Sequence, residues 1–148
     1  MGNRDRVIFT RMCLFTIQIY LMISKIYLPF LEKTKPTIII KSTVVPGTLN
    51  FIKKLLEKNK NKEGIDFELL SNPEFLREGS AINDTRNPHV VIVGGNDTKS
   101  RKKLVEFYKK IYPKNQDYVK TNATTAEMIK YANNAFLATK ITFINSMA

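Results

Sequence analysis

Short apolar runs and amphipathic stretches alternate along the chain from Pro36 onward. Residues 37–40 (TIII) form a continuous β-branched run, which is typical of a strand buried on both faces of a sheet. Similar runs predict further strands at 67–70, 90–93 and 118–121. Between them, apolar residues recur at the spacing of amphipathic helices. These residues are Leu49, Ile52, Leu55 and Leu56 in one stretch and Leu104, Val105, Tyr108 and Ile111 in another.

Strands that alternate with helices in this way predict an α/β fold with a largely parallel sheet. The last stretch differs, because residues 124–148 contain no glycine or proline and keep near-helical apolar spacing. We interpret it as one long α-helix that follows the sheet. No glycine cap or proline stands near Ala148, so we expect the chain to end inside this helix, as in a truncated protein or a fragment.

The N-terminal stretch is harder to interpret. Residues 12–23 are strongly apolar and follow three arginines, as in a signal peptide, but no small-residue cleavage site follows them. A membrane helix needs about 20 apolar residues, whereas Gln18 and residues 24–25 interrupt this run. The pattern favours a buried helix or strand over a membrane element.

Composition narrows the function classes. Lys and Arg total 24 against 13 Asp and Glu, a formal charge of +11, which suits a polyanionic partner or a lysine-rich solvated surface. We expect no nucleic-acid partner, since only the charge points to one. The single cysteine, Cys13, excludes a disulfide framework within the chain and fits a reducing compartment, so we expect a cytoplasmic location. The single histidine, His89, cannot build a His-based metal site, and we expect no metal.

A polar cluster directly follows the strand predicted at 37–40. It comprises Lys41, Ser42, Thr43 and Val44. Ligands of open α/β sheets bind at the carboxyl ends of strands, where hydroxyls and free N–H groups can contact a cofactor or a water. On spacing alone, a polar strand-to-helix turn is the favoured interpretation.

A second cluster, residues 71–79, follows the strand predicted at 67–70. Glu74 and Glu78 are four residues apart, so one helical turn would place both carboxylates on one face. One could serve as a base and the other as a hydrogen-bond acceptor, while Arg77 could pair with a phosphate or carboxylate. The alternative is a helix start with acidic residues near its positive dipole end.

The third cluster lies on the long helix. Lys130 and Asn134 are also four residues apart and stand among apolar residues. An ammonium and an amide that point at one substrate oxygen would stabilise negative charge developing there. A solvated lysine beside a polar asparagine is at least as good a local interpretation.

Four segments that contain these clusters resemble the UDP-glucose/GDP-mannose dehydrogenase family in their order and spacing. They are KSTVVPGT (41–48), SNPEFLREGSAIND (71–84), NPHVVIVGG (87–95) and AEMIKYANNAFLATKITFIN (126–145). The resemblance implies a partial Rossmann-like NAD-binding domain at 26–123 and the start of a central dimerisation helix at 124–148. Residues 1–25 match nothing in the family.

The resemblance also implies a reaction. Family members oxidise the C6 alcohol of a nucleotide sugar to a carboxylate with two NAD⁺, through a cysteine-bound thioester. The residues of the motifs resemble UDP-glucose dehydrogenases more closely than GDP-mannose enzymes. By position, Thr43 would help to hold the catalytic water and Glu74 would be the base of thioester hydrolysis. Lys130 would steady oxyanions, with Asn134 beside C6.

Binding roles follow from the same resemblance. Ser42, Thr43 and Val44 would border the NAD site, and Glu78 would contact NAD. The substrate pocket would be lined by Glu74, Phe75, Leu76, Arg77, Lys130 and Asn134.

The chain departs from the family in ways that bear on activity. It has no G-x-G-x-x-G turn for a pyrophosphate, and the family's nucleophilic cysteine would lie beyond residue 148. We do not assign that role to Cys13, and His89–Val90 replaces a frequent Asp-Arg pair. We therefore expect a fragment that is inactive alone and pairs through residues 124–148 with a second copy or a complementing dehydrogenase chain. The alternative is a non-catalytic remnant that binds a nucleotide sugar or a related dehydrogenase chain.

Overall fold

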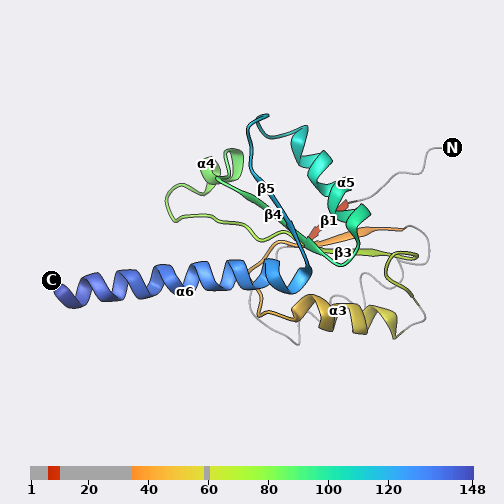
Figure 1. Ribbon diagram of the computed structural model, residues 1–148, viewed down its shortest axis with the longest axis horizontal. Coiled ribbons are helices and arrows are strands. Elements are labelled where there is room, and N and C mark those ends of the chain that lie inside the picture. Colours follow the sequence, from red (N-terminus) through yellow and green to blue (C-terminus); the bar gives the residue numbers. More distant parts are fainter. Residues whose placement is uncertain (1–6, 11–34, 59–60) are drawn as a thin grey trace.

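The computed structural model describes residues 7–10, 35–58 and 61–148, which build one five-stranded sheet in the order β1-β2-β3-β4-β5 (Figure 1). The strands are β1 Val7–Thr10, β2 Thr37–Ile40, β3 Glu68–Ser71, β4 Val91–Gly95 and β5 Tyr118–Thr121. The helices are α3 Thr48–Glu57, α4 Ala81–Arg86, α5 Thr98–Lys109 and α6 Ala123–Met147. This arrangement confirms the predicted α/β fold with a long final helix.

Helices cover both faces of the sheet, and the side chains of β2 explain why. Ile38 and Ile40 pack with α3 and the start of α6, whereas Ile39 packs in a separate cluster with α5. Successive strand residues point to opposite faces, so a strand covered on both sides needs apolar residues throughout. The continuous run in β2 therefore has its physical cause in the two helical layers.

Strand pairing confirms the expected sheet with one difference. β2 pairs in parallel with both β1 and β3, and β4 pairs in parallel with β5, but β3 and β4 are antiparallel. Parallel neighbours need a crossover that returns the chain to the opposite edge. Here the connection runs out through α4 and re-enters the sheet from the carboxyl edge of β3 (Figure 1).

The bounds of β2 to β5 and of the final helix match the expectations to within two residues. β2 and β5 lie where predicted, β3 begins one residue later, and β4 runs from residue 91 to residue 95. β1 and α4 were not anticipated. The apolar segment at 12–23 lies outside the described residues.

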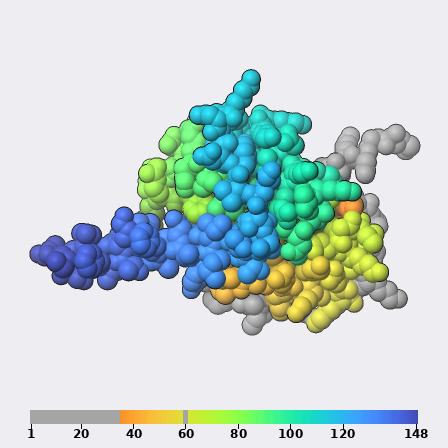
Figure 2. Space-filling model, in the orientation of Figure 1, coloured from red at the N-terminus to blue at the C-terminus, as the bar shows by residue number. Residues whose placement is uncertain are grey.

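Helix α6 begins against the sheet and then projects away from it, as Figures 1 and 2 show. Ala126 is fully buried where α6 crosses β4 at Gly94. From Tyr131 onward every residue of the helix is exposed. Among the described residues, no helix is long and apolar enough to cross a membrane.

Candidate active site

The carboxyl edge of β2 and β3 brings two of the predicted clusters together. The two strands are parallel and in register, with Ile40 opposite Ser71. Residues 41–44 and 72–74 therefore leave the sheet at the same edge, where ligands of open α/β sheets bind. A backbone hydrogen bond of 2.9 Å from Asn72 N to Ile40 O extends the pairing to the start of both segments.

Asn72 connects three elements at this edge. Its Oδ1 accepts hydrogen bonds from Lys41 Nζ at 3.0 Å and from Tyr108 Oη at 2.5 Å. Its Nδ2 donates to the carbonyl oxygen of Ile92 at 2.7 Å. These bonds fix the residue that stands two positions before Glu74, and sequence reasoning gave Asn72 and Tyr108 no such role.

Glu74 lies near the ammonium groups of the buried Lys130 and the half-buried Lys41. Burial lowers the pKa of Lys130, and the attraction of Glu74 opposes that shift. Burial likewise lowers the pKa of Lys41, again opposed by Glu74. The Lys130 ammonium also lies 4.9 Å from the centre of the Phe75 ring, within cation–π range. The structure thus brings Glu74 and Phe75, in the segment that follows β3, close to Lys130 on α6.

A small cavity opens beside these groups. Its volume is about 60 Å³, enough for a few water molecules. Lys41, Asn72, Glu74, Phe75 and Tyr108 are among its lining residues. A wider, open depression of about 640 Å³ lies over α4, but among the described residues Arg86 is the one ionisable side chain that lines it. We therefore expect the chemistry beside the smaller cavity, which Glu74 and Phe75 line and which Lys130 adjoins through the Phe75 ring.

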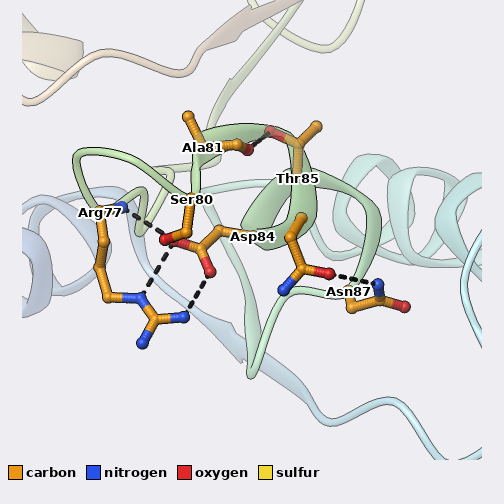
Figure 3. A network of polar contacts seen from close by, with 7 residues as sticks. Arg77, Ser80, Ala81, Asp84, Thr85 and Asn87 are labelled. Atoms are coloured by element: carbon orange, nitrogen blue, oxygen red, sulfur yellow. Dashed lines mark hydrogen bonds and ion pairs between the residues drawn. The ribbon is translucent and has the colours of Figure 1, made fainter.

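Arg77 is held by an ion pair with Asp84, shown in Figure 3. The buried Asp84 carboxylate accepts hydrogen bonds from Arg77 N at 2.9 Å, Nε at 3.2 Å and Nη2 at 2.7 Å. Ser80 Oγ adds a fourth at 3.0 Å. The Arg77 guanidinium holds the pKa of the Asp84 carboxyl well below its usual range. These Arg77–Asp84 contacts, which we call the Asp84 clasp, fix the segment between Glu74 and Glu78. They occupy guanidinium N–H groups of Arg77 that the sequence analysis expected to pair with a phosphate or carboxylate of a ligand.

The other predicted site residues lie at the surface around this edge. Thr43, Glu78 and Asn134 are exposed, while Ser42, Val44 and Leu76 are half-buried. Asn134 follows Lys130 by one helical turn, so both lie on one side of α6. Within the described ranges, no hydrogen bond or ion pair joins Glu74 to Thr43 or Asn134. Their convergence on one cleft stays a prediction.

Comparison with family models assigns both parts of the chain. Residues 19–112 match the NAD binding domain of the UDP-glucose/GDP-mannose dehydrogenase family, and residues 124–148 match the central domain of that family. NAD is therefore the cofactor of the domain that the first match describes. Residues 19–25, which we expected to match nothing in the family, lie within the first match.

Curated relatives share nearly half of the aligned residues. UDP-glucose 6-dehydrogenase of Rickettsia typhi is 47% identical over 111 residues, which cover 75% of this chain and 25% of the relative. UDP-glucose 6-dehydrogenase TuaD of Bacillus subtilis is 46% identical over 111 residues, with 75% and 23% covered. The chain spans about a quarter of the length of these relatives.

Solved structures share the fold. GDP-mannose dehydrogenase from Pseudomonas aeruginosa, in a ternary complex, superposes with a TM-score of 0.80 at 32% identity. That superposition covers 98% of this chain and 33% of the other. UDP-glucose dehydrogenase from Pyrobaculum islandicum gives a TM-score of 0.66 at 35% identity, with 76% and 25% covered.

The described residues fit only part of an NAD site. A pyrophosphate needs an open helix N-terminus, but the N-terminus of α3 is filled by the Glu127 carboxylate, which accepts hydrogen bonds from Gly47 N and Leu49 N. The chain also contains no G-x-G-x-x-G turn. The exposed side chains of Thr43 and Glu78 fit a contact with another portion of the cofactor. Among the described residues, no His, Cys, Asp and Glu cluster could hold a metal ion.

Proposed function

Because this chain belongs to the UDP-glucose/GDP-mannose dehydrogenase family, we propose that it forms part of an NAD-dependent nucleotide-sugar dehydrogenase. The proposed substrate is UDP-glucose, whose C6 alcohol the assembled enzyme oxidises to the carboxylate of UDP-glucuronate. The names and identities of the curated relatives support this choice. Since the chain spans about a quarter of those relatives, the full reaction is proposed for the assembled enzyme.

The observation that carries the proposal is the proximity of Glu74 and Lys130 at the carboxyl edge of the sheet. A largely buried ammonium is a strong stabiliser of negative charge, because little water screens it. We propose that Lys130 stabilises the oxyanion formed at C6 and that Glu74 takes a proton from the attacking water in thioester hydrolysis. Phe75 supports the ammonium through the face of its ring.

The remaining predicted residues surround this pair in the proposal. Thr43 helps to hold the water and Asn134 stands beside C6, on the same side of α6 as Lys130. Ser42, Thr43, Val44 and Glu78 contact the cofactor. Leu76 and Arg77 complete the substrate wall, with the Asp84 clasp supporting Arg77.

The exposed part of α6 is evidence that this helix binds another chain. Phe136, Ile141, Phe143, Ile144 and Met147 are large apolar side chains with more than half of their surface exposed. A helix this apolar and this exposed is typical of an interface. We propose that it pairs with a second copy of the chain or with a complementing dehydrogenase chain. Sedimentation equilibrium of the 148-residue polypeptide, compared with Phe136→Ser/Ile144→Ser, tests the first option.

The 148-residue polypeptide is not expected to catalyse the reaction by itself. It contains no glycine-rich turn to seat the pyrophosphate, and its one cysteine, Cys13, is not assigned as the nucleophile. Purified polypeptide incubated with UDP-glucose and NAD⁺ should form no NADH. Steady NADH formation that Lys130→Ala abolishes would contradict this expectation.

A chimera tests the positive part of the proposal. Residues 35–148 replace the matching segment of the Rickettsia typhi relative, which supplies the remainder of the enzyme. This chimera should form NADH from UDP-glucose and NAD⁺, and Lys130→Ala should abolish the activity. Thr124→Ala, an exposed change on the same helix, is the matched control and should retain it. A folded chimera without activity, or one indifferent to Lys130→Ala, would support the non-catalytic alternative.

A further inference from the structure

Glu127 joins two segments that lie far apart in the sequence. Its carboxylate is buried, and its Oε2 accepts a hydrogen bond of 2.7 Å from the backbone N–H of Gly47. Its Oε1 accepts a second bond of 2.8 Å from the backbone N–H of Leu49. The polar face of one helix thus contacts the first turn of another across a separation of about eighty residues.

The first turn of α3 has no cap of its own. Its N-cap residue is Gly47, which has a φ of 96° and no side chain to accept a hydrogen bond. The first N–H groups of a helix need acceptors, and they favour a negative charge. Glu127 supplies both from α6. Burial raises the pKa of Glu127, and the two backbone N–H groups oppose that shift by stabilising the carboxylate.

The contact reaches both halves of the proposed site. Glu127 precedes Lys130 by three residues on α6, and the two side chains are therefore neighbours on one face of the helix. Gly47 ends the loop, residues 41–47, that carries Ser42 and Thr43 from β2 to α3. A carboxylate that holds the end of this loop also fixes the loop against the helix that carries Lys130.

We propose that Glu127 is a positioning residue, whose carboxylate clamps the 41–47 loop to α6 and so sets the place of Thr43 relative to Lys130. Its catalytic meaning rests on the proposed function of the site. Neither the sequence clusters nor the proposed chemistry assigns Glu127 a role. Its side chain makes no proposed contact with substrate or cofactor, so it acts through the loop.

Amide hydrogen exchange of the 148-residue chain, followed by NMR, tests the clamp. In the unsubstituted chain the Gly47 and Leu49 amides should be protected, because each donates to a buried carboxylate. Glu127→Gln puts an N–H donor against one of them and should speed their exchange by about tenfold or more. The native-state amide shifts of Ser42 and Thr43 should also move, whereas a residue that contributed only stability would leave those shifts unchanged.

Two further variants sharpen the test. Glu127→Asp keeps the charge but is one methylene shorter, so it should retain part of the protection. Thr124→Ala is the matched control: Thr124 also faces α3, through a bond of 3.5 Å from Asn50 Nδ2, but it is exposed and contacts neither amide. That variant should leave both exchange rates unchanged.

The possible outcomes separate the clamp from the proposed function. Solvent-like exchange of Gly47 and Leu49 in the unsubstituted chain would overturn the clamp without any variant. Unchanged exchange in Glu127→Gln, or an equal change in Thr124→Ala, would overturn it as well. These measurements use neither NAD⁺ nor UDP-glucose. An inactive chimera would therefore contradict the proposed function alone, while faster exchange in Glu127→Gln would still support the clamp.

Discussion

Replacing Gly94 by alanine places a methyl group at the crossing of α6 and β4. A Cβ built on Gly94 would lie 2.3 Å from the Cβ of Ala126 and 2.9 Å from the carbonyl oxygen of Asn122. Both are rigid neighbours, since alanine has no rotamer to change and Asn122 O belongs to the backbone of the helix cap. The methyl group can therefore be accommodated only if the helix recedes from the sheet.

The required movement is about 1 Å before ordinary van der Waals contact is reached. Overpacking of a close-packed interior costs about 1–3 kcal/mol, and this contact belongs at the upper end because neither neighbour can rotate away. We expect a loss of about 3 kcal/mol in the free energy of unfolding. For a chain of this size, that loss lowers the melting temperature by roughly 6–12 °C.

Urea unfolding followed by circular dichroism measures the loss, with Gly95→Ala as the matched control. A Cβ on Gly95 meets the end of the buried Leu70 side chain at 2.4 Å and the carbonyl oxygen of Leu69 at 3.3 Å. Because the leucine can change rotamer whereas the neighbours of Gly94 cannot, the cost should be smaller, about 1–2 kcal/mol. The double variant Gly94→Ala/Ala126→Gly should lose at least about 1 kcal/mol less free energy of unfolding than the two single variants lose together. A Gly94→Ala protein as stable as Gly95→Ala, or a double variant with no such recovery, would refute the packing of α6 on β4.

Other consequences concern charge and the site. Arg77 lowers the pKa of Asp84, so the ionised carboxylate stabilises the folded chain above pH about 4, and this stability is lost as the pH falls. The urea midpoint of Asp84→Asn should not show this loss. Burial lowers the pKa of Lys130, so the unfolded chain binds the proton more tightly and stability should rise as the pH climbs toward 10.5. Lys130→Met should make that rise smaller, leaving the part that the lowered pKa of Lys41 contributes, and should be no less stable at pH 7. Phe75→Leu should cost about 1 kcal/mol in urea unfolding by removing the cation–π contact.

Local sequence patterns predicted the strand bounds well where the apolar residues are the same residues that form hydrogen bonds in the sheet. β2 and β5 lie at their predicted bounds because all of their residues except Lys120 are β-branched or aromatic. β3 is displaced by one residue because Phe67 is buried but the ladder begins at Glu68, and apolarity reports burial rather than pairing. β4 continues through its two glycines because Gly94 must let α6 approach, a tertiary demand that no local pattern carries.

The site residues also fall into those that local sequence indicated and those that depend on contacts between distant segments. Glu74 and Lys130 stand in segments that resemble a family, and Glu74 lies close enough to Lys130 to oppose the lowering of its pKa. The catalytic roles that the resemblance implies for them stay a prediction. Asn72, Tyr108 and Glu127 were not anticipated, because their bonds join residues 20 to 80 positions apart. Their roles depend on which elements meet in space. The polar residue directly after a strand is the one available signal, and it would have singled out Asn72.

The chimera with the Rickettsia typhi relative offers one measurement that separates Glu74 from a bystander: the NADH formed per enzyme by its Glu74→Gln variant. Each UDP-glucose converted to UDP-glucuronate yields two NADH, and in the proposal Glu74 acts only afterwards, when water hydrolyses the thioester. The variant should therefore release a burst of about two NADH per active site and then turn over at least roughly 100-fold more slowly than the unsubstituted chimera. Steady turnover at the unsubstituted rate, with no burst, would contradict the account.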